Sequence, residues 1–246
     1  MLKVEMLKLK HKHIGLMLIG SIFIQFVVAI YADNKSETNI IQGYMISLYQ
    51  FAQLNVIIFP IIIGVIMSNL CDIEHKGNTF KQLFTMQEVK KLFNTKFIIA
   101  TSYLLLGLAF QILGIVVIGQ YLNFGDTLPV KQYILYFISQ SATNVFVIIL
   151  IQSFALYFSN QFVPIVLGIT GSFLGLMSGF FGKLVMMFIP TSYYQLLTTV
   201  SMKWSRKPRT ISYTFIDFPV FSFIIIISLS IITFFVGRRY FKKKEV

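Results

Sequence analysis

The feature that most constrains this chain is a series of six apolar runs, each of 18 residues or more. About 20 predominantly apolar residues are needed to cross the hydrocarbon core of a bilayer as a helix. A closed barrel would show shorter, alternating segments instead, so the sequence predicts an all-α integral membrane protein. The runs cover Ile14–Tyr31, Tyr44–Leu70, Phe97–Leu122, Tyr133–Phe158, Phe162–Pro190 and Pro219–Val236.

Composition argues against a soluble or disordered chain. Hydrophobic residues make up 56% of the 246 residues and charged residues only 12%, whereas soluble domains carry about 25% charged residues. The net charge of +12 would suggest nucleic acid in a soluble protein, but here the positions of the charges matter more than their sum, and we expect no nucleic-acid partner. A single cysteine, Cys71, excludes a disulfide framework and a multi-cysteine metal site.

The fifth run is too long for one upright span and too short for two. We therefore expect a span over 162–181, followed by an outer loop over 182–218 that contains re-entrant helices. Because the polar stretches are too short for an independent fold, residues 1–246 should form one transmembrane domain. Its six helices are expected at about 14–31, 44–70, 97–122, 133–158, 162–181 and 219–236.

The distribution of basic residues predicts the orientation, because cytoplasmic loops carry an excess of Lys and Arg. With the N-terminus inside, 14 of the 21 basic residues are cytoplasmic. Both termini should therefore be cytoplasmic. The basic stretch Lys203–Arg209 opposes this orientation, because it is placed outside.

The first run could instead be a cleaved signal peptide. A membrane span is favoured, because the run is long and its exit lacks a clean small-x-small site.

Catalytic motifs are weak. The nearest approach to a phosphate-binding loop, Gly179–Leu184, has the wrong spacing and lacks the hydroxyl residue. His11 and His13 lie in a Lys-rich tail, where solvated histidines are more common than metal ligands. The spans show no nucleophile paired with a base, so we expect neither an enzyme nor a metal site.

The spans instead carry neutral polar residues. Spacings of three or four residues place Gln50 with Gln53, and Gln140 with Asn144, on shared helix faces, and Asn55 follows in the second span. These five residues either form hydrogen bonds between helices or line an amphipathic translocation path between subunits. A row of small residues predicts close helix packing within the chain or a dimer interface; its members are Gly171, Gly175 and Gly179, with Gly168 one turn earlier.

The most informative segment, 71–96, joins the second and third spans. Gly77-Asn78 favours a turn, and Thr79 is a suitable cap for a short amphipathic helix through Leu83 and Phe84. Such a helix is either an interfacial anchor or a lever that docks a soluble motor.

The stretch from Glu74 through Asn78-Thr79-Phe80-Lys81-Gln82-Leu83, together with Glu5–Lys10 before the first span, resembles ABC-2 type transporter permeases. Within these it is similar to permeases of lantibiotic-immunity and bacteriocin-protection transporters. The family usually has a proline shortly after this leucine, where this chain has Thr85-Met86-Gln87.

The resemblance implies a multi-pass permease of the bacterial cell membrane that expels or exports amphipathic antimicrobial peptides. It implies a second permease copy or a related permease, and separate ATPase subunits that bind ATP and Mg²⁺, with no cofactor in this chain. Residues 1–13 would form an elbow helix and 71–96 the coupling segment. The ATPase-coupling residues would be Glu74, Thr79, Phe80, Lys81, Leu83 and Phe84.

Other functions stay open. An ABC-2 permease for a drug, a lipid-linked polymer or a heme-type molecule is one alternative, and a non-transport membrane scaffold is another. The scaffold predicts no bound ATPase and tolerance of changes at Glu74.

The predicted orientation can be tested with Ser205→Cys. The introduced thiol should react with a membrane-impermeant reagent added to intact cells, because residues 182–218 are expected outside. The unsubstituted chain, whose only cysteine is Cys71, is the control and should stay unlabelled. Protection of residue 205 in intact cells, with labelling after lysis, would show that the spans are miscounted.

Overall fold

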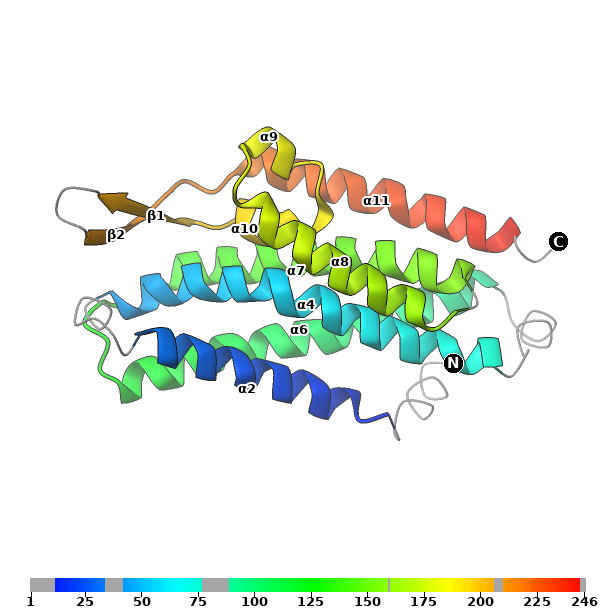
Figure 1. Ribbon diagram of the computed structural model, residues 1–246, viewed down its shortest axis with the longest axis horizontal. Helices are drawn as coiled ribbons and strands as arrows, with labels where there is room; N and C mark the ends of the chain where they lie inside the picture. The colour runs from blue at the N-terminus through cyan, green and yellow to red at the C-terminus, as the bar shows by residue number, and fades with distance from the viewer. Residues whose placement is uncertain (1–11, 34–41, 77–88, 159, 206–209, 244–246) are drawn as a thin grey trace.

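Long, nearly antiparallel helices form a single bundle in the computed structural model, which describes residues 12–33, 42–76, 89–158, 160–205 and 210–243 (Figure 1). The long helices are α2 (Ile14–Asp33), α4 (Gly43–Lys76), α6 (Val89–Tyr121), α7 (Val130–Tyr157) and α11 (Val220–Lys243). Between α7 and α11 lie α8 (Phe162–Ser178), α9 (Lys183–Met186), η1 (Pro190–Ser192), α10 (Tyr193–Leu196) and the antiparallel hairpin of β1 (Val200–Ser205) and β2 (Thr210–Phe215).

The two ends of the bundle differ. One carries the β1–β2 hairpin and the α6–α7 connection, 122–129, and is called the hairpin end (Figure 1). At the opposite, terminal end, the described chain begins before α2 and ends after α11. The successive long helices run back and forth between these two ends.

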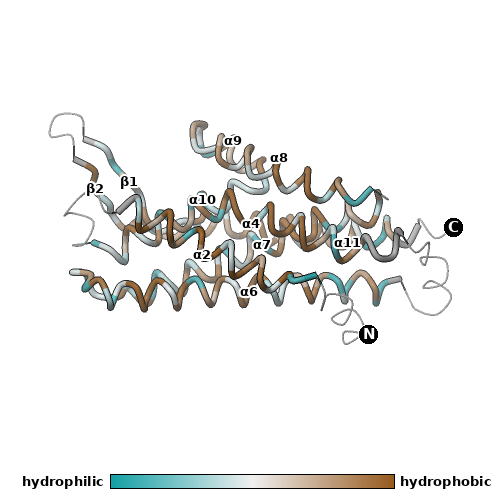
Figure 2. The backbone as a smooth tube through the Cα atoms, turned by 60° about the horizontal axis from the view of Figure 1, so that its bottom comes forward, coloured by the Kyte–Doolittle hydropathy of each residue, from teal (hydrophilic) through white to brown (hydrophobic). Residues whose placement is uncertain are grey.

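Five helices in the described part of the chain are long and apolar enough to cross a membrane. They confirm the prediction of a mostly helical membrane protein, and Figure 2 shows that hydrophobic residues dominate along the bundle. The sixth apolar helix, α8, has only 17 residues and ends at Ser178, three residues before the expected end of the fifth span. The five candidate spans are Ile14–Tyr31, Gly43–Cys71, Lys90–Tyr121, Val130–Tyr157 and Val220–Phe241.

Helices α4 and α7 form the centre, with α2 and α6 on one side and α8 and α11 on the other (Figure 1). Within an 18-residue apolar window of each helix, 61% of the residues are buried in α4 and in α7, against 28% in α2 and 17% in α11. The peripheral helices therefore keep wide apolar faces open, which suits lipid or another protein.

The tightest packing joins α4 to α8 and depends on two matching Pro-x-x-x-Gly segments. A methyl group added to Gly168 would overlap the carbonyl oxygen of Pro60, and one added to Gly64 would overlap the carbonyl oxygen of Pro164. Only glycine permits this reciprocal approach of two backbones. The Ser172 hydroxyl adds a hydrogen bond to the Ile57 carbonyl at 2.6 Å.

At the hairpin end, Asp126 from the α6–α7 connection caps α4. Its two carboxylate oxygens accept hydrogen bonds from the backbone N–H groups of Tyr44 and Met45, each at 3.1 Å. These are among the first backbone donors of a helix, which have no partner within the helix itself. A negative charge at a helix N-terminus is also favourable, so one side chain fixes where α4 begins.

The structure adds two features to the sequence predictions. The described parts of the 71–96 segment continue the bundle helices, because α4 extends to Lys76 and α6 already begins at Val89. The expected outer loop, 182–218, contains short helices but also the β1–β2 hairpin. Both strands alternate polar and apolar residues, the period-two pattern of a half-covered strand, which the search for long apolar runs overlooked.

The α4–α8 contact predicts that Gly168→Ala destabilises the fold by about 1–3 kcal/mol, the usual effect of overpacking, because the added methyl group meets backbone. Thermal unfolding of the purified protein in mild detergent measures this loss. The matched control is Gly20→Ala in α2, where a methyl group meets nothing within 4 Å; replacing that helical glycine should be neutral or stabilising. Equal unfolding temperatures for the two variants would contradict the close backbone contact.

Candidate functional site

The fifth passage of the chain through the bundle is interrupted near its middle. After α8 the chain leaves the bundle through α9 and returns at η1, where the Thr191 hydroxyl donates to the Gly171 carbonyl at 2.5 Å. The next helix, α10, is deeply buried, and the Tyr194 ring lies 6.0 Å from that of Phe59 in the middle of α4. Irregular backbone at membrane depth is tolerated only where protein or a water-filled cavity surrounds it. The bundle must therefore supply hydrogen-bond partners here.

Helix α7 supplies them. Gln140 donates from Nε2 to the backbone carbonyl of Tyr194 at 3.0 Å. One turn further along α7, Asn144 accepts a hydrogen bond at Oδ1 from the Tyr194 hydroxyl at 2.5 Å. The four-residue spacing that places both amides on one face of α7 thus places them both against α10.

Asn55 of α4 joins these contacts to α6. Its Nδ2 lies 3.0 Å from Oε1 of Gln140 and 2.7 Å from the Tyr136 hydroxyl. Its Oδ1 accepts a hydrogen bond from Nε2 of Gln111 at 2.9 Å. The Tyr136 hydroxyl in turn donates to Oε1 of Gln111 at 2.9 Å. Asn55 therefore uses both ends of its amide, and α4, α6 and α7 are held together at one level.

The same cluster reaches α2, because Gln111 Nε2 also donates to Oε1 of Gln25. We call the connected side chains the amide network. All are at least 96% buried, although every one is polar. The amide network consists of Gln25, Asn55, Gln111, Tyr136, Gln140, Asn144 and Tyr194.

Two amide nitrogens at opposite ends of the network, Gln25 Nε2 and Asn144 Nδ2, are buried without a hydrogen-bond partner among the described residues. All seven side chains are neutral amides or phenols, which can both donate and accept hydrogen bonds. Such groups can bind backbone carbonyls and can join neighbouring helices. Breaking such buried bonds is costly because a donor or acceptor then stays unpaired in an apolar setting.

The structure separates the five predicted path residues into two groups. Asn55, Gln140 and Asn144 belong to the amide network and form hydrogen bonds between elements. Gln50 and Gln53 are half-buried on α4. The Gln53 side chain hydrogen-bonds to the Tyr49 hydroxyl, and the Tyr49 ring lies 5.7 Å from Tyr213 of β2.

The predicted glycine row packs within the chain. Gly175 lies against Val56 of α4 and Thr191 of η1, and Gly171 also meets Thr191. Gly179 lies beside the Gln195 side chain of α10. These glycines therefore let η1 and α10, which follow α9, pack closely against α8.

Most of the predicted ATPase-coupling residues lie outside the described residues. Of the set, only Glu74 falls within a described element, in the last turn of α4. Next to this segment, Lys96 of α6 is fully buried and donates from Nζ to the Leu70 carbonyl of α4. The coupling residues outside the described ranges are Thr79, Phe80, Lys81, Leu83 and Phe84.

A second polar tie at the terminal end joins α7 to α6. Gln152 donates from Nε2 to the Phe93 carbonyl at 2.8 Å. Together with Lys96, it links α4, α6 and α7 near the start of α6. A displacement of the start of α6 would therefore be transmitted to both α4 and α7.

Four members of the network were not chosen as site residues from the sequence: Gln25, Gln111, Tyr136 and Tyr194. A glutamine inside an apolar run is the available signal for Gln25 and Gln111. The two tyrosines give no such signal, because tyrosine is common at the ends of membrane spans.

Two apolar cavities lie elsewhere along α7. One, of about 310 Å³, is bordered by Ser153, Phe154 and Tyr157 of α7 and by α11. The other, of about 280 Å³, is bordered by α4, α7, α8 and η1. They share Leu150 and Phe154, and neither is lined by a member of the amide network. The network side chains are buried in the bundle, whereas mostly apolar side chains line both of these cavities.

A family model described as ABC-2 family transporter protein matches residues 1–175. The matched range includes α2, α4, α6, α7 and α8 as far as Gly175. No curated protein sequence and no solved structure matches the chain.

The amide network predicts that Asn55→Leu lowers stability by about 1–3 kcal/mol, because Gln140 Oε1 is left buried without its donor. The thermal unfolding midpoint in detergent measures the loss. Gln53→Leu is the matched control on the same helix, since Gln53 is half-buried and hydrogen-bonds to Tyr49, one turn away on α4. An Asn55→Leu protein as stable as the control would argue against a role for the network in holding the bundle.

Proposed function

The chain belongs to the ABC-2 family of transporter proteins, and we propose that it is a permease that expels or exports amphipathic antimicrobial peptides, powered by separate ATPase subunits. The match over residues 1–175 is the observation that carries the permease role. The peptide cargo, the oligomeric state and the orientation are the finer parts of the proposal, and each has its own support.

The proposed topology has six crossings with both termini in the cytoplasm. Helix α8 begins at the terminal end, and the chain that follows it reaches the hairpin end through α10 and β1. We take this interrupted passage as the fifth crossing. The basic residues Lys90, Lys91, Arg238 and Arg239 lie at the terminal end, which supports a cytoplasmic position for that end.

The proposed ATPase partners bind at the terminal end, on the segment that contains Glu74 and Lys81. Buried ties from Lys96 to α4 and from Gln152 to α6 lie beside the attachment of this segment. Closure of the ATPases would push the segment, and these ties would pass the displacement to the central helices. Rigid-body movement of packed helices is a common form of such coupling.

The proposed second permease copy packs against an open helix face. Helices α2 and α11 are the least buried of the candidate spans. The side chains of the amide network are buried in the bundle and hydrogen-bond to one another. The cargo would therefore travel along a surface shared by two copies rather than through a single chain.

The chemistry of the spans supports an amphipathic peptide as cargo. The five candidate spans contain no Asp or Glu. The half-buried Gln50 and Gln53 offer neutral hydrogen-bonding groups, and wide apolar faces surround them. Such a surface can accept both the backbone and the apolar side chains of a peptide.

Purification tests the partner. The tagged chain, extracted in mild detergent from its own cells, should co-purify with a stoichiometric ATPase. An intact, monodisperse chain with no ATPase would favour a membrane scaffold instead.

A variant test addresses coupling and cargo together. Lys81→Ala and Glu74→Ala should abolish protection of cells against an amphipathic peptide while leaving membrane insertion intact, because both lie in the proposed docking segment. Lys183→Ala is the matched control, since Lys183 starts α9, which lies away from the end of α4 (Figure 1). Protection by both docking variants equal to wild type would disprove the docking assignment. An associated ATPase without protection by the wild-type chain would redirect the search to another cargo.

A further inference from the structure

The β1–β2 hairpin has one apolar face and one polar face. Register pairs Met202 with Tyr213 and Trp204 with Ile211, and alternate residues of a strand point to the same face. The polar face carries Ser201, Lys203, Ser212 and Thr214. The apolar face carries Val200, Met202, Trp204, Ile211, Tyr213 and Phe215.

The bundle covers only part of the base of the apolar face. Val200 is fully buried and Tyr213 packs against Tyr49 of α4, while Phe215, opposite Val200, is 47% exposed. Toward the turn, Met202 is 41% exposed, Ile211 53% and Trp204 62%. The cross-strand pair of Trp204 and Ile211 therefore presents a large apolar surface that the rest of the described chain leaves open.

The depth of this pair follows from α4. Its candidate span, Gly43–Cys71, has 29 residues, which corresponds to about 43 Å at 1.5 Å per residue. A bilayer measures about 40–45 Å including its headgroup regions, so Gly43 lies at headgroup level. Tyr49 lies about 9 Å deeper along the helix.

The hairpin extends from the level of Tyr49 toward the hairpin end (Figure 1). The Trp204–Ile211 pair is two residues closer to the turn than the pair that contains Tyr213, a rise of about 7 Å. Trp204 consequently lies close to the level of Gly43. This is the interfacial layer, where tryptophan side chains concentrate in membrane proteins.

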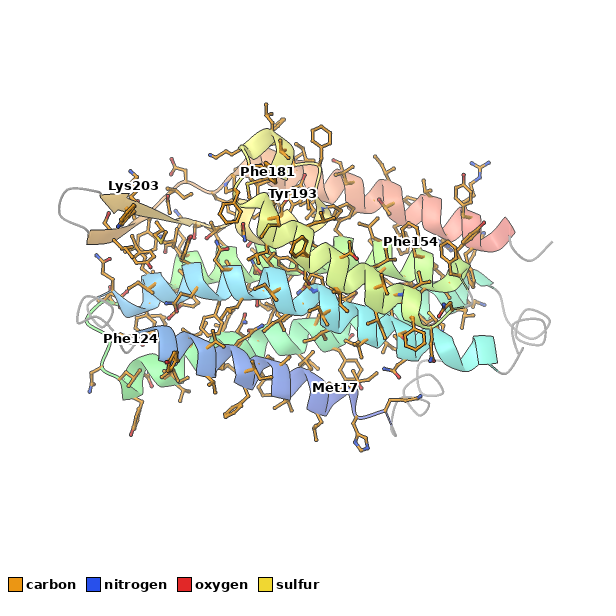
Figure 3. All side chains as sticks on the ribbon, viewed as in Figure 1. Met17, Phe124, Phe154, Phe181, Tyr193 and Lys203 are labelled. Atoms are coloured by element: carbon orange, nitrogen blue, oxygen red, sulfur yellow. The ribbon has the colours of Figure 1, made fainter. Side chains whose placement is uncertain are left out.

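We propose that the exposed apolar tip of the hairpin binds the interfacial layer of the bilayer, with Trp204 and Ile211 inserted at the boundary between headgroups and acyl chains. The partner is an anionic phospholipid. Lys203 lies on the polar face, away from α4 and α7 (Figure 3), and its flexible stem lets the ammonium group reach lipid phosphates. The sequence between the strands, 206–209, adds three basic residues.

This inference needs only a membrane-spanning bundle and is independent of the proposed cargo. It gives a reason for the basic character of the sequence Lys203–Arg209, which opposes the orientation that the other charges favour. The attraction of basic residues to anionic lipid supplies a reason for the segment to be basic.

Trp204 is the only tryptophan of the chain, so its fluorescence reports on this position alone. The full-length protein is reconstituted in vesicles of phosphatidylcholine and phosphatidylglycerol, with lipids brominated either near the headgroup end or near the methyl end of the acyl chain. Trp204 emission should be blue-shifted relative to the unfolded chain. It should be quenched more by bromine near the headgroups than by bromine near the chain ends.

The matched control moves the reporter to the middle of a span. In the double variant Trp204→Phe with Leu106→Trp, the new tryptophan replaces an exposed leucine near the midpoint of α6. Its quenching should follow the opposite order, with the chain-end bromines more effective. This control confirms that the protein is inserted and that depth is resolved.

Two results would overturn the proposal. One is Trp204 emission typical of water, open to an aqueous quencher and insensitive to both brominated lipids. The other is a blue shift that appears only when an amphipathic peptide is added, which would assign the face to cargo. The anionic lipid has its own test. Quenching of Trp204 should be stronger in vesicles that contain phosphatidylglycerol than in vesicles of phosphatidylcholine alone, and Lys203→Gln should reduce this difference. Equal quenching in neutral and anionic vesicles would refute the anionic lipid as partner.

Discussion

The arrangement of this bundle depends on one constraint, which is that backbone polar groups inside a membrane need partners from protein. The chain breaks its helix after α8 and places the short helix α10 near the middle of α4. Gln140 and Asn144 supply the hydrogen bonds that the broken segment needs. Asn55 then satisfies Gln140 and passes the polar contacts on to α6 and α2. A single irregular segment thus explains why so many uncharged amides lie in an otherwise apolar interior.

Helix α4 is held by polar contacts at three levels. The Asp126 carboxylate fixes its start, the amide network its middle, and Lys96 the region near its end through the Leu70 carbonyl. Each contact comes from a different part of the chain, and each is directional, unlike the apolar packing between them. This helix is therefore the frame against which the α6–α7 connection, the interrupted passage and the start of α6 are positioned.

The sequence predicted the long helices well, because an apolar run of sufficient length has few alternatives in a membrane. It also selected Asn55, Gln140 and Asn144, since polar residues are conspicuous in such runs. It did not predict that Tyr194 meets Asn144, because a contact between residues 50 positions apart depends on how the chain returns after α9. The hairpin was not predicted for another reason. Its strands have six residues each and are therefore shorter than the apolar runs that identify membrane spans.

The reciprocal contact of the two Pro-x-x-x-Gly segments has a mechanical consequence. Gly64 faces the carbonyl of Pro164 while Gly168 faces the carbonyl of Pro60, so the interface reads alike from either helix. A shift of one turn along the shared axis would bring a side chain against backbone at both glycines at once. These contacts hold α4 and α8 in register, so the two helices should move as one rigid unit. The outer helices α2 and α11 bury a smaller share of their residues, although Gly237 of α11 also packs closely against Ser153 of α7. Any rearrangement of the bundle would therefore keep α4 and α8 together.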